Sequence, residues 1–224
     1  MISFTEKSRA EAFRYMGIKG DIPENIRAAA HECEGLLGAA AVPKYHWTYA
    51  DISENTGDRV TFSGHRLTLS GKDICSHLSG CFGAALMCVT LGEGVDRLLR
   101  TLQAQDMAKA LAADALASAA VETVCDEAEE VIRERFPGEY FTWRFSPGYG
   151  DLPLECQGDF LAAVDAMRRV GVCLSPGGLL TPTKSVTAVV GISETEISRK
   201  RRGCVSCTMK DRCAFRKNGG HCNG

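Results

Sequence analysis

The chain has 224 residues, of which 45% are hydrophobic and 24% charged, a composition typical of one globular domain with room for a small appendage. Its formal net charge of −2 gives no electrostatic support for binding nucleic acid or an anionic membrane surface. No apolar run reaches the roughly 18 residues of a membrane span, and Glu6, Lys7 and Arg9 stand where a secretory signal needs an apolar stretch. We therefore expect a cytoplasmic protein.

Two helices are expected at the start of the chain. Thr5 and Glu6 can cap a short helix that ends near Gly17. Pro23 suits the first turn of a second helix, in which apolar residues recur at helical spacing as far as about Ala41.

Strands are expected next. The segment 45–52 is aromatic and β-prone, and the segment 81–91 is nearly all small or apolar, as in a buried strand. Between them, apolar residues alternate on either side of a Ser63-Gly64-His65 turn, which predicts a β-hairpin. These alternating residues are Val60, Phe62, Leu67 and Leu69.

The longest regular element is predicted over 106–136. Asp106 is a plausible N-cap, and Pro137-Gly138 ends the helix. Its apolar residues step by three or four and form one stripe: Ala110, Ala113, Ala117, Val121, Val124, Ala128 and Val131. Because most of them are alanine, a neighbouring element can approach this helix closely.

The remaining elements alternate between strand and helix. A short strand is expected over 140–145, a helix over 159–170 and a final strand over 186–192, with Pro/Gly-rich loops at 146–153 and 175–182. Since these elements do not form regular βαβ repeats, we predict an α+β fold with a mainly antiparallel twisted sheet flanked by helices.

One of these loops has the composition of a ligand site. Arg144 ends a strand and offers a planar fork that suits a carboxylate. Gly148 and Gly150 allow the backbone to approach a ligand closely, and Tyr149 offers a ring that can pack on an apolar or cationic group. A structural turn with an ion-paired arginine is the alternative interpretation.

The same loop carries a resemblance to a known family. Arg144-x-x-Pro147-Gly148-Tyr149-x-x-x-Pro153 resembles the signature of the activation domain of cobalamin-dependent methionine synthase. Two further blocks in the same order resemble that family: the end of the long helix, with Ala120-Val121-Glu122 and Ile132-Arg133, and the segment Pro182-Thr183-Lys184-Ser185-Val186. The three blocks span roughly residues 110–192.

The resemblance implies a site for S-adenosylmethionine. Arg144 matches the family arginine that contacts the carboxylate end of the ligand, and Pro147, Gly148 and Tyr149 match loop positions that line it. Glu122 falls where the family has an acidic ligand contact; without the family it would be read as a solvated helix residue. No catalytic acid, base or nucleophile is implied.

The chain also departs from the family pattern. Leu154-Glu155-Cys156 stands where the family commonly has a histidine after the last proline of the loop. The family's tyrosine pair after the P-x-x-S-V strand is absent, because the segment 192–202 contains no aromatic residue. Both departures concern the adenosine side of the implied pocket.

Four of the eleven cysteines crowd the end of the chain. Cys204, Cys207, Cys213 and Cys222 follow a basic segment and can hold a structural zinc ion or an iron–sulfur cluster; free or redox-active thiols are the alternative. We therefore divide the chain into an activation-domain-like part, 1–197, and a short Cys-rich C-terminal tail, 198–224. The seven other cysteines are scattered among apolar residues, and most are expected to be buried.

Three functions stay open. The first is an accessory subunit that supplies S-adenosylmethionine for reductive methylation of cob(II)alamin on a methionine synthase lacking its own activation domain, with flavodoxin or ferredoxin as electron donor. The second is an activator of another corrinoid protein that uses the cysteine tail as a redox centre. The third is a metal-stabilised interaction module whose ligand pocket has decayed.

Overall fold

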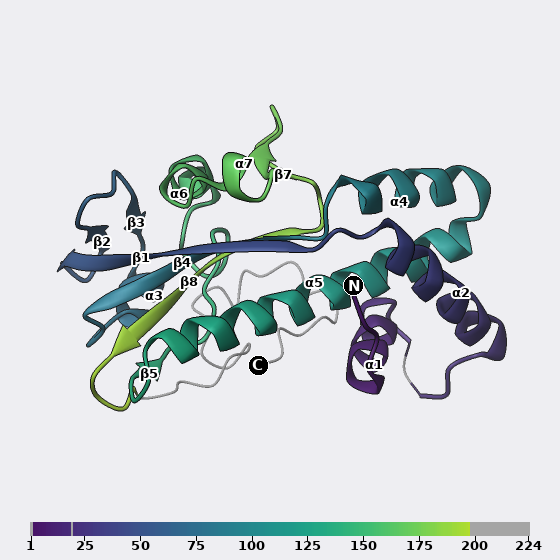
Figure 1. The fold of residues 1–224 in the computed structure, drawn as a ribbon, viewed down its shortest axis with the longest axis horizontal. Helices are drawn as coiled ribbons and strands as arrows, with labels where there is room; N and C mark the ends of the chain where they lie inside the picture. Colours follow the sequence, from purple (N-terminus) through teal and green to yellow (C-terminus); the bar gives the residue numbers. More distant parts are fainter. Residues whose placement is uncertain (1, 19, 198–224) are drawn as a thin grey trace. The chain divides into compact units, whose positions relative to one another are not determined.

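The computed structural model describes residues 2–18 and 20–197, and the Cys-rich tail lies outside this part of the chain. The fold is α+β, with a six-stranded antiparallel sheet flanked by helices (Figure 1), as the sequence predicts. The helices are α1 (Glu6–Tyr15), α2 (Glu24–Ala40), α3 (Lys72–His77), α4 (Glu93–Gln105), α5 (Met107–Arg135), the 3-10 turn η1 (Leu154–Cys156), α6 (Gln157–Ala163) and α7 (Ala166–Arg169). The strands are β1 (Lys44–Asn55), β2 (Arg59–Phe62), β3 (Thr68–Ser70), β4 (Gly83–Thr90), β5 (Tyr140–Phe141), β6 (Cys173–Leu174), β7 (Leu180–Thr181) and β8 (Ser185–Ser193).

These elements belong to two compact units, each assembled from three separate stretches of sequence. The first unit comprises residues 2–46, 88–132 and 165–186, and the second comprises 47–87, 133–164 and 187–197. None of the helices in the described part of the chain combines the length and apolar character needed to span a membrane.

Helices dominate the first unit. α2 packs against α4, and the start of α4 approaches so closely that a side chain at Gly94 would collide with the carbonyl oxygen of Ala40. Salt bridges join α2 to its other neighbours: Arg9 on α1 contacts Glu34 at 2.6 Å, and Lys109 on α5 contacts Glu32 at 2.7 Å. The oxygen of Asp106 accepts from two main-chain N–H groups and caps α5, as predicted.

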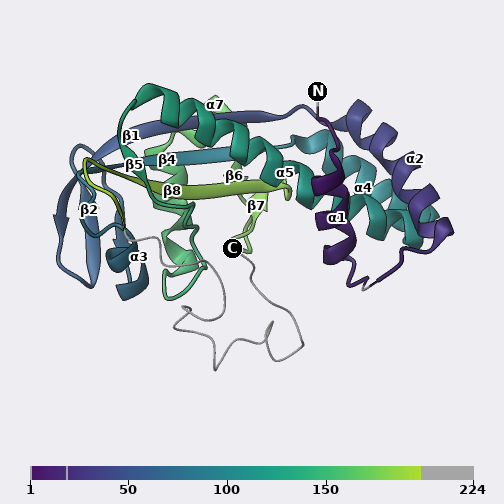
Figure 2. The same cartoon turned by 90° about the horizontal axis from the view of Figure 1, so that it is seen from below.

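The sheet belongs mainly to the second unit, with the strand order β3-β2-β1-β4-β8-β5. Its long strands β1, β4 and β8 lie side by side (Figure 2). The predicted hairpin is confirmed: Val60 of β2 pairs with Leu69 of β3. β4 is buried along its whole length, as expected of a central strand. Where β4 begins, Gly83 has no side chain, and the ring of Tyr49 on β1 fills the space that a Cβ would occupy.

Helices of the second unit lie against this sheet. α3 packs beside β2 and β3. α6 is tied to β8 by a buried hydrogen bond of 2.5 Å from the Gln157 amide to the Thr187 hydroxyl. This arrangement places α3 next to the loop that the sequence marks as a ligand site.

Two predicted elements differ from the structure, and several observed elements were not predicted. The strand expected over 140–145 is regular only in β5 and continues as a single bridge between Phe145 and Val189. The helix expected over 159–170 is two helices, because Asp165 adopts a left-handed conformation with φ of 50° between α6 and α7. α3, α4 and the β6–β7 hairpin were not predicted.

Candidate functional site

The loop 144–153 is an ordered double turn in the second unit. Its first end is fixed to β8, because Phe145 and Val189 exchange hydrogen bonds of 2.9 and 2.8 Å. The loop then folds on itself through three main-chain hydrogen bonds, from Tyr149 N–H to Ser146 O (3.0 Å), Leu152 N–H to Tyr149 O (3.1 Å) and Gly148 N–H to Leu152 O (2.9 Å). The buried Leu152 side chain anchors the second turn.

Two glycines make this double turn possible. Gly148 and Gly150 have φ of 86° and 57°, in the left-handed region that favours glycine. A Cβ at Gly148 would touch only the Leu154 side chain, at 3.4 Å, so one side of this residue is open. A Cβ at Gly150 would collide with the carboxylate of Asp73 on α3. The loop is therefore exposed at Gly148 and tightly packed at Gly150.

The second end of the loop is fixed to the start of α3. The Asp151 carboxylate accepts hydrogen bonds from the main-chain N–H groups of Lys72, at 2.8 Å, and Asp73, at 3.0 Å. The residue before this helix is Gly71, which has no side chain to cap it. Asp151 thus supplies the helix cap from 79 positions further along the chain.

An aromatic cluster lies beside the loop. Trp143 and Phe145 stack with their ring centres 5.3 Å apart, and Tyr149 meets both edge-on, at 5.7 and 5.4 Å. The ring of His77, the last residue of α3, lies 4.5 Å from that of Trp143. Its Nε2 is 2.8 Å from the Trp143 carbonyl oxygen, and since a carbonyl only accepts, Nε2 carries the proton.

The structure brings four of the five predicted ligand residues together on this loop. Arg144, Pro147 and Tyr149 are half-buried, and Gly148 is exposed. The fifth, Glu122, is half-buried on α5 in the first unit. Burial, together with a hydrogen bond that the Tyr15 hydroxyl donates to the Glu11 carboxylate, raises the pKa of Tyr15 on α1 to about 12, and the charge of Glu122 adds to this effect.

Lys184 and Ser185, in the P-x-x-S-V segment, have structural partners in the first unit. The Lys184 ammonium lies 2.8 Å from Asp114 and 2.9 Å from the Ser118 hydroxyl, both on α5. The Ser185 hydroxyl donates to the carbonyl of Pro182 at 2.7 Å. These contacts tie the start of β8 in place.

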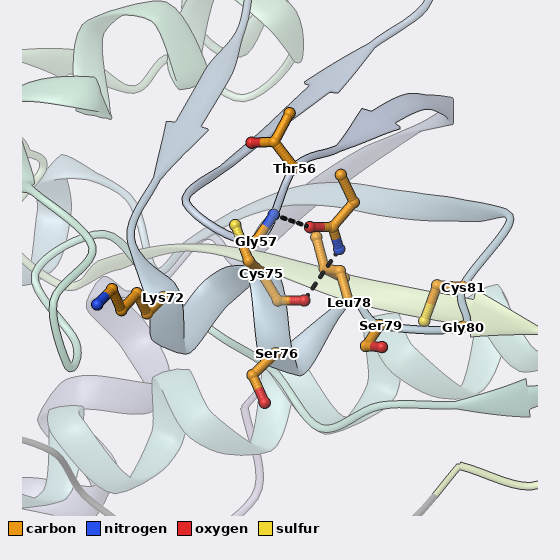
Figure 3. A pocket seen from close by; sticks show the side chains of 10 residues that line it. Thr56, Gly57, Lys72, Cys75, Ser76, Leu78, Ser79, Gly80 and Cys81 are labelled. Atoms are coloured by element: carbon orange, nitrogen blue, oxygen red, sulfur yellow. Dashed lines mark hydrogen bonds between the residues drawn. The ribbon is translucent and has the colours of Figure 1, made fainter.

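A cleft of about 570 Å³ opens on α3 in the second unit (Figure 3). α3 contributes Lys72, Cys75 and Ser76, and the β1–β2 turn faces them with residues 55–57. The turn is held to α3 by a hydrogen bond of 2.9 Å from the Asn55 amide to the Cys75 carbonyl. None of the five predicted ligand residues lines this cleft.

The metal prediction falls on residues that the structure does not describe: Cys204, Cys207, Cys213 and Cys222. Within the described residues, no group of three or more His, Cys, Asp or Glu side chains is placed to hold a metal ion. Four of the seven cysteines in this part of the chain are buried, as expected of small apolar residues: Cys33, Cys75, Cys88 and Cys125.

Comparison with known proteins finds a likeness in three dimensions. No protein-family model matches the sequence, and no curated protein matches it. The fold is similar to the crystal structure of the MetH reactivation domain bound to AdoHcy, with a TM-score of 0.59 and 15% sequence identity. The alignment covers 96% of this chain and 83% of that one. At this identity the likeness establishes the shared fold.

Proposed function

We propose that this chain binds S-adenosylmethionine and acts in the cytoplasm as an accessory subunit of a cobalamin-dependent methionine synthase that lacks its own activation domain. There it supports the reductive methylation of cob(II)alamin. The observation that carries the proposal is the ordered Arg144–Pro153 loop, whose R-x-x-P-G-Y sequence stands in a fold similar to that of a domain bound to AdoHcy, the demethylated form of S-adenosylmethionine.

The chemistry of the loop suits such a ligand. The guanidinium of Arg144 offers paired donors to the carboxylate of the methionyl group. The open side of Gly148 leaves room for close approach of the ligand to the backbone. Tyr149 and the neighbouring Trp143 present half-buried rings of the kind that pack on a sulfonium ion or an adenine. Glu122 is the proposed acidic contact.

The proposed role of the chain is to bind and orient. Bound S-adenosylmethionine would supply the methyl group, and the partner protein would hold the cobalamin. A flavodoxin or ferredoxin would deliver the electron that the reduction requires. The loop residues would hold the methyl donor in one position. The donor and the cobalamin would then not have to meet by diffusion in the right orientation.

We test ligand binding by calorimetric titration with S-adenosylmethionine. Arg144→Ala removes both donors to the carboxylate and should raise Kd by at least about a hundredfold, since two hydrogen bonds to charged groups contribute roughly 1.5–3 kcal/mol each. Arg97→Ala is the matched control, because Arg97 forms an exposed pair with Glu93 on α4, away from the loop in sequence. Absence of binding to the unaltered protein up to millimolar ligand would contradict the proposal.

The tail 198–224 is proposed as a separate metal-binding appendage. If its four cysteines hold zinc or an iron–sulfur cluster, metal analysis of the purified full chain should find it in stoichiometric amount, and a chain ending at residue 197 should lack it. Iron rather than zinc would favour the second candidate, an activator of another corrinoid protein with its own redox centre. A metal-free full chain would contradict the metal proposal.

A further inference from the structure

α3 is joined to both ends of the candidate ligand loop. At its first turn, the N–H groups of Lys72 and Asp73 bind the Asp151 carboxylate, which follows Tyr149 by two positions. At its last residue, His77 binds the carbonyl of Trp143, the residue directly before Arg144. The four loop residues proposed to bind the ligand therefore lie between two attachment points on a single six-residue helix.

The attachment through Asp151 is closely fitted. A Cβ at Gly71, where φ is 143°, would lie 2.5 Å from Oδ1 of Asp151. A Cβ at Gly150 would collide with the carboxylate of Asp73. Each aspartate thus lies against a glycine of the opposite segment. The loop and the start of α3 can approach this closely because both positions, 71 and 150, are glycine.

The attachment through His77 is supported by aromatic packing as well as by its hydrogen bond. His77 contacts the rings of Trp143 and Phe145, so loss of its hydrogen bond would leave these aromatic contacts in place. Asp151 has an exposed side chain, and its two hydrogen bonds are the contacts that hold it on α3. The attachment of this end of the loop to α3 thus depends on the Asp151 carboxylate.

We infer that Asp151 is a positioning residue for the ligand loop. By capping α3 it holds the Gly148–Gly150 turn in its open conformation and keeps Tyr149 against Trp143. Loss of the carboxylate allows the loop to sample other conformations, and binding must then restore the ordered one, which lowers the apparent affinity. The inference rests on the proposed function for the identity of the ligand, but not for the effect on the loop.

The experiment combines titration with S-adenosylmethionine and quenching of Trp143 fluorescence by acrylamide. The chain has two tryptophans, so Trp47→Phe leaves Trp143 as the only one, beside the loop. In this background we compare Asp151→Ala, Asp151→Asn and Asp106→Ala. Asp106 is the matched control, because its carboxylate also accepts two main-chain N–H groups at a helix start, on α5 of the other unit.

Asp151→Ala should raise Kd about five- to tenfold, the loss expected for a helix cap, and should make Trp143 more accessible to acrylamide. Asp151→Asn should give intermediate values, because its amide oxygen can accept one of the two N–H groups and the side chain keeps its size. Asp106→Ala should lower stability by a similar amount and leave both Kd and quenching at background values.

The inference is overturned if Asp151→Ala matches Asp106→Ala in both Kd and quenching. Absence of S-adenosylmethionine binding in the Trp47→Phe background and in the unaltered chain would instead overturn the proposed function. In that case, greater quenching of Trp143 in the Asp151 variants than in Asp106→Ala would still show that Asp151 orders the loop. Equal quenching in all variants would refute that role.

Discussion

Gly191 of β8 occupies a position where no side chain fits. A Cβ there would lie 2.6 Å from the Cys81 sulfur and 2.8 Å from a Leu78 methyl group. Gly191→Ala should therefore destabilise the protein by about 1–3 kcal/mol through overpacking. Urea unfolding measures the effect. Gly35→Ala is the control, because Gly35 lies within α2 with no atom in the way, and should stabilise by roughly 0.5–1 kcal/mol.

If both alanine variants shift stability in the same direction, steric fit is not what selects glycine at position 191.

The Gln157–Thr187 hydrogen bond is buried, with each residue only 3% exposed. Gln157→Leu leaves the Thr187 hydroxyl without this partner and should destabilise by about 1–3 kcal/mol. The double variant Gln157→Leu/Thr187→Val removes both polar groups and should recover much of that loss. A double-mutant cycle from urea unfolding checks this. Additive losses in the double variant would mean that the two side chains act independently.

The sequence predicts the loop residues of the candidate site but not their surroundings. Arg144, Gly148 and Tyr149 lie within six positions of one another, so a motif can contain them. His77 reaches Trp143 across 66 positions and Asp151 reaches Lys72 across 79, and no local pattern encodes such distances. Their only signal in the sequence is chemical type: a histidine and an aspartate without an assigned role.

At the scale of elements, periodicity predicts long helices well and short ones poorly. α5 begins and ends within one residue of its expected bounds, because its stripe repeats over 29 residues. α3 has six residues, fewer than two turns, and carries no measurable period. The division between α6 and α7 is not predictable from glycine or proline, since the residue in the left-handed conformation is Asp165.

α4 could have been predicted, because Val95, Leu99 and Leu102 recur at helical spacing and all three are buried. Leu99 is 6% exposed, and Leu99→Ala should destabilise the protein by about 2–5 kcal/mol. Leu111→Ala, at a position 55% exposed on α5, should change stability by less than about 0.5 kcal/mol. Thermal or urea unfolding compares the two. Equal losses would show that α4 does not contribute its apolar face to the core.

At the scale of the whole molecule, stability should fall at alkaline pH. Burial in β4 raises the pKa of the Cys88 thiol to about 12, whereas a cysteine in an unfolded chain ionises near 8.5. The folded state keeps a proton that the unfolded state loses. The contribution of Cys88 to stability is therefore fully present below about pH 8.5 and is lost as pH rises toward 12, by about 1.4 kcal/mol per pH unit.

Cys88→Ala should flatten this decline. Between pH 8.5 and 10 the free energy of unfolding of the variant should fall by about 2 kcal/mol less than that of the unaltered chain, measured in urea under reducing conditions. Burial also raises the pKa of Cys81 and of Cys156, each to about 11, so part of the decline should persist in the variant. Parallel curves for the two proteins would contradict the assignment to Cys88.

The α+β class follows from the irregular alternation of helices and strands, and it could be predicted. The division into two compact units could not. Each unit draws on three separate stretches of sequence, and the chain passes between them within β1, β4, α5 and β8 and once more between α6 and α7. Hydrophobic periodicity describes one element at a time and contains no information on which elements assemble together.

The contact between Tyr49 and Gly83 also has a consequence for misfolding. A strand that slips by one position turns every side chain to the opposite face, so a contact that tolerates one register only helps to specify the pairing. Here a shift of β4 along β1 would bring Ala84 or Phe82 to the place under the tyrosine ring, where only a hydrogen atom fits. One glycine and one ring thus exclude the misaligned sheets and leave a single alignment of β1 with β4.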